Sequence, residues 1–158
     1  MSEDNLVKVV LCQEHDDDEV DIEVPWALAL GNNHYQLKNY PFFFYGLSFD
    51  DVFEALPTYE DDPRPYFTKV IKKSGHRTIR INFERSIKES NDSQEVLTTL
   101  SKMGCGSEGT DGTCFFVINI QPHCDFDEIC DYLIASEVDF DWEHADPPYA
   151  VLFPNGEG

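Results

Sequence analysis

The sequence is short of positive charge. It holds 11 Lys and Arg against 31 Asp and Glu, a formal net charge of −20 over 158 residues. It also lacks any apolar run of about 18 residues, so no membrane-spanning helix is predicted. The first residues, Met1 to Asn5, lack the basic and apolar regions of a secretory signal peptide. We therefore expect a protein of the cytoplasm that does not act at a membrane.

Cysteines are few and do not form a framework. There are five of them, an odd number at wide spacings, which is typical of reduced thiols rather than of a disulfide scaffold. His123-Cys124 with Cys130 has no second ligand pair of the kind zinc sites use, and Cys130 is spaced like an inner residue of a helix. The Asp16–Glu19 run lacks the glycine and the terminal glutamate of a calcium loop. We expect no metal.

Cofactor loops are missing as well. The stretch Gly104-x-Gly106-x-x-Gly109 matches a dinucleotide fingerprint in letters, but it follows a predicted helix and leads into a predicted hairpin. A working fingerprint follows a strand and opens a helix, because aligned N–H groups must meet the pyrophosphate. The stretch is therefore interpreted as a helix end and a turn, and no cofactor is expected.

The sequence is rich in hydrophobic residues, and its basic residues are concentrated in one segment. Hydrophobic residues make up 41% and aromatic residues 13% of the chain, too much for a disordered acidic tail. Between positions 64 and 88 there are eight bases and one acid, a local net charge of +7, so the remaining residues carry −27. The eight bases are Arg64, Lys69, Lys72, Lys73, Arg77, Arg80, Arg85 and Lys88. We expect this basic strip to pair with acids or to edge a protein complex. The surrounding negative charge disfavours nucleic-acid binding.

The first half of the chain, residues 1–77, is predicted to be mostly strand. Leu6–Leu11 is an apolar run of strand length, and Val20–Val24 alternates as a half-buried strand does, with a polar hairpin tip between them. Trp26–Leu30 ends at the turn Gly31-Asn32-Asn33, and Ser48–Asp51 is interpreted as a turn before a further strand. Tyr66–Lys73 and Thr78–Phe83 are predicted strands joined by a hairpin at Ser74-Gly75-His76, with Gly75 at positive φ.

The second half, residues 78–146, shows the order strand, helix, strand, strand, helix, strand. One helix is predicted from Asp92 as N-cap to a C-terminal Gly104, and another from Asp125 as N-cap, with Phe126, Ile129, Leu133 and Ile134 turned inward. A hairpin through residues 109–112 and a final strand at Val138–Glu143 complete the set. This order predicts a ferredoxin-like half with both helices on one face of an antiparallel sheet, in an α+β protein. Residues 147–158 are predicted to be an irregular tail.

Several short motifs resemble a bacterial family known as domain of unknown function 4265. They are Trp26-Ala27, Asn39-Tyr40-Pro41-Phe42, Gly46-Leu47-Ser48 with Asp50-Asp51, and Ser74-Gly75-His76-Arg77-Thr78 with Arg80. The resemblance runs from about Val7 to Asp146, and position 50, an aspartate here, is often glycine in such sequences. The family has no settled activity. Small acidic bacterial proteins of this kind often resemble immunity proteins, which neutralise a toxin encoded beside them.

Two kinds of functional site remain open. Ser74, His76 and Thr78 could supply a nucleophile and a base, but no nucleophile elbow accompanies them, so a small enzyme or a ligand-binding regulatory module around Ser74–Arg80 is the alternative. The leading hypothesis is a non-catalytic acidic protein that occludes the basic cleft of a toxin. Its predicted partner-binding residues are Asp16, Asp17, Asp18, Glu60, Asp61, Asp62, Asp139, Asp141, Glu143 and Asp146.

Overall fold

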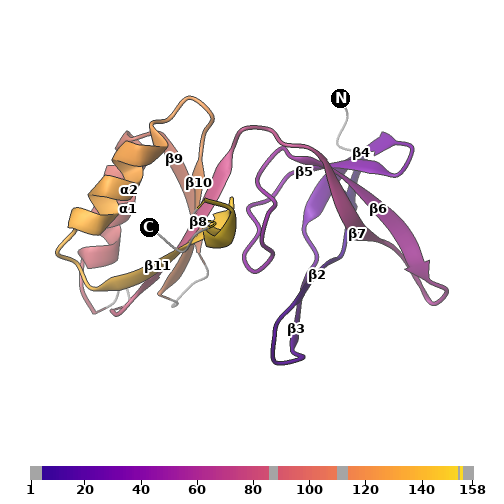
Figure 1. The fold of residues 1–158 in the computed structure, drawn as a ribbon, viewed down its shortest axis with the longest axis horizontal. Coiled ribbons are helices and arrows are strands. Elements are labelled where there is room, and N and C mark those ends of the chain that lie inside the picture. Colours follow the sequence, from indigo (N-terminus) through magenta and orange to yellow (C-terminus); the bar gives the residue numbers. More distant parts are fainter. Residues whose placement is uncertain (1–4, 86–88, 110–113, 153, 155–158) are drawn as a thin grey trace. The chain divides into compact units, whose positions relative to one another are not determined.

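The computed structural model describes residues 5–85, 89–109, 114–152 and 154. The chain is an α+β protein that divides into two compact units, Met1–His76 (unit 1) and Arg77–Gly158 (unit 2) (Figure 1). The predicted turn at residues 110–112 and Lys88 of the basic strip lie outside the described residues. No described helix is both long and apolar enough to cross a membrane.

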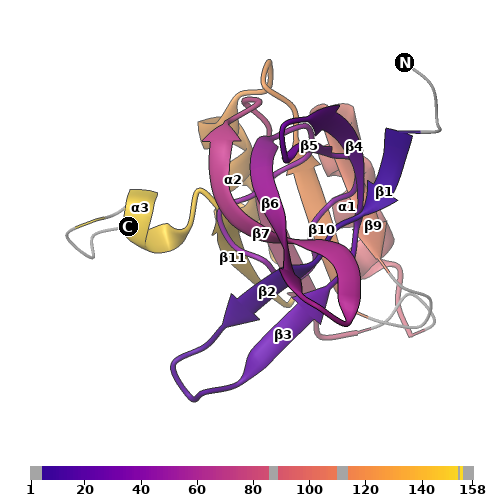
Figure 2. The same cartoon turned by 90° about the vertical axis from the view of Figure 1, so that its right-hand side faces the viewer.

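Unit 1 is built from strands. Its five-stranded antiparallel sheet has the order β1-β4-β5-β6-β7, and β2 pairs with β3 in a separate two-stranded sheet (Figure 2). The strands are β1 (Leu6–Lys8), β2 (Leu11–Glu14), β3 (Val20–Glu23), β4 (Trp26–Gly31), β5 (His34–Leu37), β6 (Val52–Tyr59) and β7 (Asp62–Lys72). The predicted Leu6–Leu11 strand is thus two strands. Val9 and Val10 separate them, with the Val10 N–H donating to the Pro65 carbonyl at 2.9 Å.

The core of unit 1 comes from alternate residues of these strands. Phe53 and Ala55 of β6 are fully buried, as the two-residue period of a strand requires when one face is covered. Leu37 of β5 and Leu11 of β2 are also fully buried in the same cluster, and Phe44 closes it with its ring 4.7 Å from that of Phe67. This cluster holds the sheet and the base of the β2–β3 pair together.

The turn at Ser48–Asp51 precedes β6, as predicted. The Ser48 N–H donates to Asp51 Oδ2 at 2.8 Å, and the Asp51 N–H donates to the Ser48 carbonyl at 3.1 Å. Asp50 lies in the left-handed region at φ +67°. A Cβ is disfavoured there, and aspartate is among the few other residues that tolerate it. This conformation gives a physical reason for glycine at this position in similar sequences.

Unit 2 combines strands with helices. Its sheet is antiparallel throughout, with the order β11-β8-β10-β9. The elements are β8 (Arg77–Phe83), α1 (Asp92–Lys102), β9 (Cys105–Gly109), β10 (Phe115–Ile120), α2 (Phe126–Ala135), β11 (Phe140–Asp146) and α3 (Tyr149–Leu152). The tail is therefore not wholly irregular, because α3 forms one helical turn in it.

The two long helices share one core with the sheet. Ile79 and Ile81 of β8 and Ile118 of β10 pack with Leu100 of α1 and Ile129 of α2. Because these strand residues lie on one side of the pleat, both helices cover the same face of the sheet. Ile134, expected to be inward, is exposed.

The helix ends were only partly predictable. Asp125 caps α2, with its side chain accepting from the Glu128 N–H at 3.1 Å, and Gly104 follows α1 at φ +96°. The predicted cap at Asp92 is wrong. Asp92 is the first helical residue, and Asn91 is the N-cap without a side-chain cap hydrogen bond.

The predicted hairpin at Ser74-Gly75-His76 is also wrong. Strands β7 and β8 belong to different sheets, so the segment links two units instead of closing one hairpin. Gly75 does take a positive φ of +98°, as expected. A glycine at positive φ was predictable, but it does not specify whether the flanking strands pair.

Candidate functional site

The most exposed acids lie on strands β2 and β3 and on the turn between them, here called the acidic ribbon (Leu11–Glu23). The ribbon extends away from the five-stranded sheet of unit 1 in both views (Figures 1 and 2). Seven carboxylates occur between positions 14 and 23, with no Lys or Arg among them. They are Glu14, Asp16, Asp17, Asp18, Glu19, Asp21 and Glu23. All but Glu23 are exposed, so the charge of this element faces water.

One face of the acidic ribbon carries two exposed aliphatic side chains beside an acid. Val20 pairs with Glu14 and Ile22 pairs with Cys12 across the two strands, so these four side chains share a face. Val20 is 51% and Ile22 60% exposed, although alternation had predicted that they would be buried. Burial and the nearby Glu14 raise the pKa of the Cys12 thiol, so Cys12 is not an activated nucleophile. The face is suited to contact rather than to chemistry.

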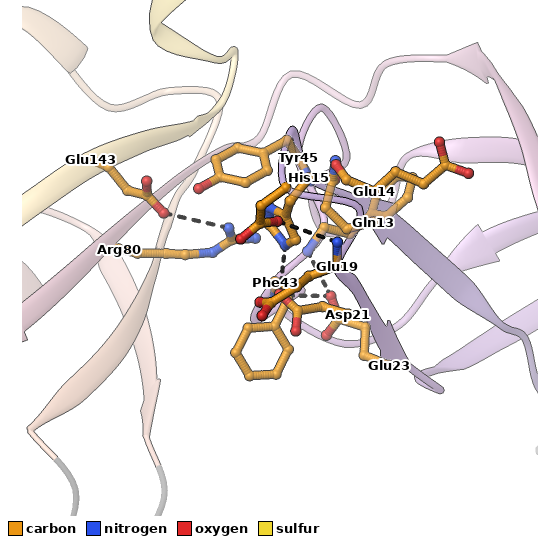
Figure 3. A network of polar contacts seen from close by, with 12 residues as sticks. Gln13, Glu14, His15, Glu19, Asp21, Glu23, Phe43, Tyr45, Arg80 and Glu143 are labelled. Atoms are coloured by element: carbon orange, nitrogen blue, oxygen red, sulfur yellow. Dashed lines mark hydrogen bonds and ion pairs between the residues drawn. The ribbon is translucent and has the colours of Figure 1, made fainter.

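The base of the acidic ribbon is held by hydrogen bonds (Figure 3). The Glu23 carboxylate accepts from the backbone N–H groups of Phe42, Phe43 and Phe44 at 2.8, 3.0 and 2.9 Å. The Gln13 Oε1 accepts from the Tyr45 N–H at 2.8 Å. Three donors on one carboxylate fix the ribbon to the loop before β6. The exposed acids are therefore presented on an anchored element.

The tip of the acidic ribbon has its own contacts. His15 Nε2 lies 2.7 Å from Asp21 Oδ2, and this hydrogen bond raises the pKa of His15 above its usual value (Figure 3). The Glu19 N–H donates to Asp17 Oδ1 at 3.2 Å, and Asp18 takes a left-handed φ of +64°. These contacts shape the tip and leave Asp16, Asp17 and Asp18 in solvent.

The second predicted acidic cluster lies at the turn between β6 and β7. Glu60 and Asp61 are exposed in that turn. Asp62 instead begins β7, where it accepts from Arg64 at 2.8 and 2.9 Å and from the Tyr66 hydroxyl at 2.7 Å. These donors, with Arg64 first among them, hold the pKa of Asp62 far below its usual range. Asp62 is thus engaged within its own strand.

The third cluster lies on β11 and just before it. Asp139, Asp141 and Glu143 are exposed, whereas Phe140 and Trp142 pack against the core, so the predicted alternation is correct. Glu143 Oε1 also lies 3.6 Å from a guanidinium nitrogen of Arg80, whose side chain is 2% exposed (Figure 3).

Asp146 does not join that exposed row. It is 4% exposed, and the register of β11 against β8 shifts between His144 and Asp146. Alternation does not place Asp146 with the other acids, because position 146 has the same parity as Phe140 and Trp142. Asp146 was included only because it is close to the other acids in sequence.

The other candidate site is a pocket of about 300 Å³ in unit 1, lined in part by Asp50, Lys72, Lys73 and His76. Asp50 pairs with Lys38 at 2.6 Å, and its other oxygen lies 4.0 Å from His76 Nε2. The His76 ring meets the edge of Phe49 with the ring centres 5.4 Å apart. Cationic groups and one carboxylate therefore meet at this pocket.

Ser74 also lines this pocket, and its hydroxyl is hydrogen-bonded. Its hydroxyl donates to the Phe49 carbonyl at 2.7 Å and accepts from the His76 N–H at 3.2 Å. The Ser74 N–H and the Lys73 ammonium both donate to Asp51, which is fully buried. Ser74 and His76 are in contact, and the hydrogen bonds of Ser74 attach this segment to the rest of unit 1. Thr78 is buried on β8 in unit 2.

The motifs considered for metals and cofactors fall into ordinary structural positions. Gly104 follows α1 and Gly109 ends β9, so the glycine stretch does not open a helix. Burial raises the pKa of Cys130 to about 11. Within residues 5–85, 89–109 and 114–152, no group of three or more His, Cys, Asp or Glu could hold a metal ion.

The chain matches a family described as Domain of unknown function (DUF4265) over residues 23–144. It belongs to this family. The match covers the motifs of the Asp50–His76 pocket, most of both units, and only the last residue of the acidic ribbon. No curated protein matches the chain.

A solved structure has a similar fold. It is described as a hypothetical protein from Neisseria gonorrhoeae, and it is 15% identical with a TM-score of 0.69. The match covers 90% of this chain and 95% of the other. At this identity the similarity supports the fold of this DUF4265 member and nothing about its activity.

Sequence reasoning missed two features of the site. It did not anticipate that Val20 and Ile22 are uncovered, because an alternating pattern has the same appearance in a ribbon exposed on both faces. It also missed the Lys38–Asp50 pair, since the two residues lie at opposite ends of the loop between β5 and β6. The one hint in the sequence was Asp50 itself, an aspartate at a turn position where similar sequences often have glycine.

Proposed function

We propose that this DUF4265 protein is a non-catalytic binding protein that captures a basic protein partner. In its most specific form it is an immunity protein of the cytoplasm that neutralises a toxin by occluding a basic cleft. The proposal needs neither nucleic acid nor a membrane as a partner. We also infer that unit 2 is a ferredoxin-like βαββαβ unit, because its element order and the sheet order β11-β8-β10-β9 fit that arrangement.

The observation that carries the proposal is the acidic ribbon. Its exposed carboxylates surround two exposed aliphatic side chains, Val20 and Ile22, on an element that Glu23 anchors at its base. An apolar centre with a charged rim is the composition of a protein interface. Negative charge of this density speeds the encounter with a basic partner, up to about 10⁸–10⁹ M⁻¹s⁻¹ at low salt.

The Ser74 geometry supports a non-catalytic role. A serine nucleophile needs a base that takes its proton, but the Ser74 hydroxyl donates that proton to a backbone carbonyl. Its second contact comes from the His76 backbone rather than from the imidazole.

Capture from extracts of the native host tests the proposal. Wild-type protein is immobilised beside a ribbon variant, Asp16→Asn with Asp17→Asn and Asp18→Asn, and retained proteins are identified by mass spectrometry. We expect wild-type protein to retain a basic protein whose activity falls when the complex forms. Association measured by stopped flow at low salt should be about tenfold slower for the ribbon variant, with the difference shrinking as salt rises.

A charge-matched variant separates the ribbon from bulk charge. Glu95→Gln with Glu108→Gln and Glu137→Gln removes three exposed acids outside the clusters and should leave association within about twofold. Equal slowing in both variants would show that net charge alone acts. A bound protein whose activity is unchanged would contradict inhibition.

The Asp50–His76 pocket supports a second candidate, a small-ligand module. Lys72 and Lys73 line it, so an anionic ligand would find cationic partners there. Titration with inorganic phosphate, followed by the His76 imidazole signals in NMR, tests it. A saturable shift lost in Lys72→Gln would favour this candidate over partner capture.

A further inference from the structure

Unit 2 contains a groove that the proposed function does not yet use. It has a volume of about 670 Å³ and is lined from helix α2, from Trp142 and His144 on β11, from α3, and from Arg77 at the start of β8. That volume is within the range of pockets that take small molecules or single side chains. All of its lining residues belong to one unit.

Aromatic rings form much of the wall of this groove. The His144 ring centre lies 4.9 Å from that of Trp142, 5.7 Å from Phe126 and 6.4 Å from Tyr149. Burial, together with the nearby Arg77, lowers the pKa of His144, which favours the uncharged form of its ring. The groove therefore presents four aromatic rings.

A cation already lies against one of these rings. The Arg77 guanidinium carbon is 4.2 Å from the centre of the Phe126 ring. This is the geometry of a cation–π contact, in which the negative face of the ring attracts the charge. The contact demonstrates that the wall of the groove accepts a guanidinium group.

The charged groups of the lining favour a further cation. Asp127 and Asp131 lie four residues apart on α2, on the same side of the helix, and both are exposed. With Arg77 as the one base, two carboxylates leave the lining at a net charge of −1. An anionic ligand would meet both this charge and the −20 of the chain.

We propose that this groove is a socket for an arginine side chain of the basic partner, with Asp127 and Asp131 pairing with the charge and Trp142 and Tyr149 packing on the guanidinium. The inference rests on the proposed function, since it names a second place at which the partner is recognised. Arginine suits the site better than lysine, because a planar guanidinium can stack on a ring and still donate to carboxylates at its edges.

The test uses a small probe, so it does not depend on finding the partner. Trp26→Phe leaves Trp142 as the single tryptophan, and its indole N–H signal is followed by NMR while N-acetyl-argininamide is added. We expect a saturable shift with this probe. The neutral isostere N-acetyl-citrullinamide should bind at least about fivefold more weakly, since it cannot make a cation–π contact or an ion pair.

Matched variants locate the binding. Asp127→Asn with Asp131→Asn should weaken argininamide binding at least about fivefold, while Glu108→Gln with Glu137→Gln, an equal change in charge outside the groove, should alter it less than about twofold. Asp127 lies in the first turn of α2, so the single variant Asp131→Asn serves if the double variant loses helix by circular dichroism.

The failure of this proposal and that of the proposed function are distinguishable. Equal binding of citrullinamide, equal losses in the two double variants, or tighter binding of benzoate than of argininamide would each overturn the socket. The first proposal would survive any of these if the ribbon variant still slowed capture of the partner. Conversely, a saturable argininamide site would stand even if no partner were retained from extracts.

Discussion

Two sets of carboxylates in unit 1 have opposite environments. Asp51 is fully buried, where it accepts from the Ser48 and Ser74 backbone and from the Lys73 ammonium. Asp16, Asp17 and Asp18 on the acidic ribbon are exposed to solvent. The same residue type therefore fixes a linker in one place and supplies surface charge in another. The net charge of the chain overstates what is available to a partner.

The largest effect on stability is expected at Asp51. Asp51→Asn should lower the free energy of unfolding by about 3 kcal/mol, because Lys73 loses its partner and an amide nitrogen faces the donors of the former carboxylate. Urea unfolding followed by Trp26 fluorescence, in a Trp142→Phe background, reports on unit 1. Asp16→Asn is the control and should stay within about 0.5 kcal/mol. Equal effects of the two substitutions would mean that the buried and the exposed aspartate contribute alike to stability.

Glu23 should give an intermediate effect, since it belongs to the ribbon and yet anchors it. Glu23→Gln should cost about 1–2 kcal/mol, because its oxygens accept three backbone N–H groups and an amide keeps one oxygen. The same unfolding assay measures the cost. Proton exchange at the Phe43 and Phe44 amides should also become faster. Unchanged exchange would mean that the carboxylate does not hold the loop.

Added salt should stabilise the protein by screening its exposed acids. The melting midpoint should rise by about 2–4 °C between 0.02 and 0.5 M NaCl, since screening relieves repulsion among the exposed acids. The triple variant Asp16→Asn, Asp17→Asn and Asp18→Asn should gain less from salt than wild-type protein. A midpoint that falls with salt would mean that ion pairs outweigh the repulsion.

The smallest effect is expected at Asp62. Its pKa is lowered by Arg64 and Tyr66, so its contribution to stability is complete above the ordinary value of 3.8 and is lost as the pH falls toward the folded value. Arg64→Gln should therefore flatten the acid side of the stability curve below about pH 4. An NMR titration of the Asp62 carboxyl carbon in both proteins checks the cause. If the titration midpoint of Asp62 is the same in both proteins, Arg64 is not the cause of its lowered pKa.

Local signals in the sequence predicted more than long-range ones. The Asp125 cap, the turn before β6 and the β11 alternation were predictable, because each depends on residues a few positions apart. The Ser74–His76 hairpin was wrong because strand pairing depends on the partner sheet, which no short motif encodes.

The candidate sites show the same limit. The exposed acids of the ribbon and of β11 followed from composition and periodicity, whereas the aromatic groove of unit 2 did not. Arg77 and Phe126 are 49 positions apart in sequence, and their contact exists only once β8 and α2 have packed. The burial of Asp146 likewise shows that closeness in sequence to exposed acids does not make a residue exposed.

The position of β11 gives its acids a role that requires no partner. The strand lies at one edge of the sheet in unit 2, where backbone groups offer a template for another chain to add a strand. Two copies meeting edge to edge would bring Asp139, Asp141 and Glu143 against the same charges. The row therefore opposes fibril-like stacking of the protein with itself.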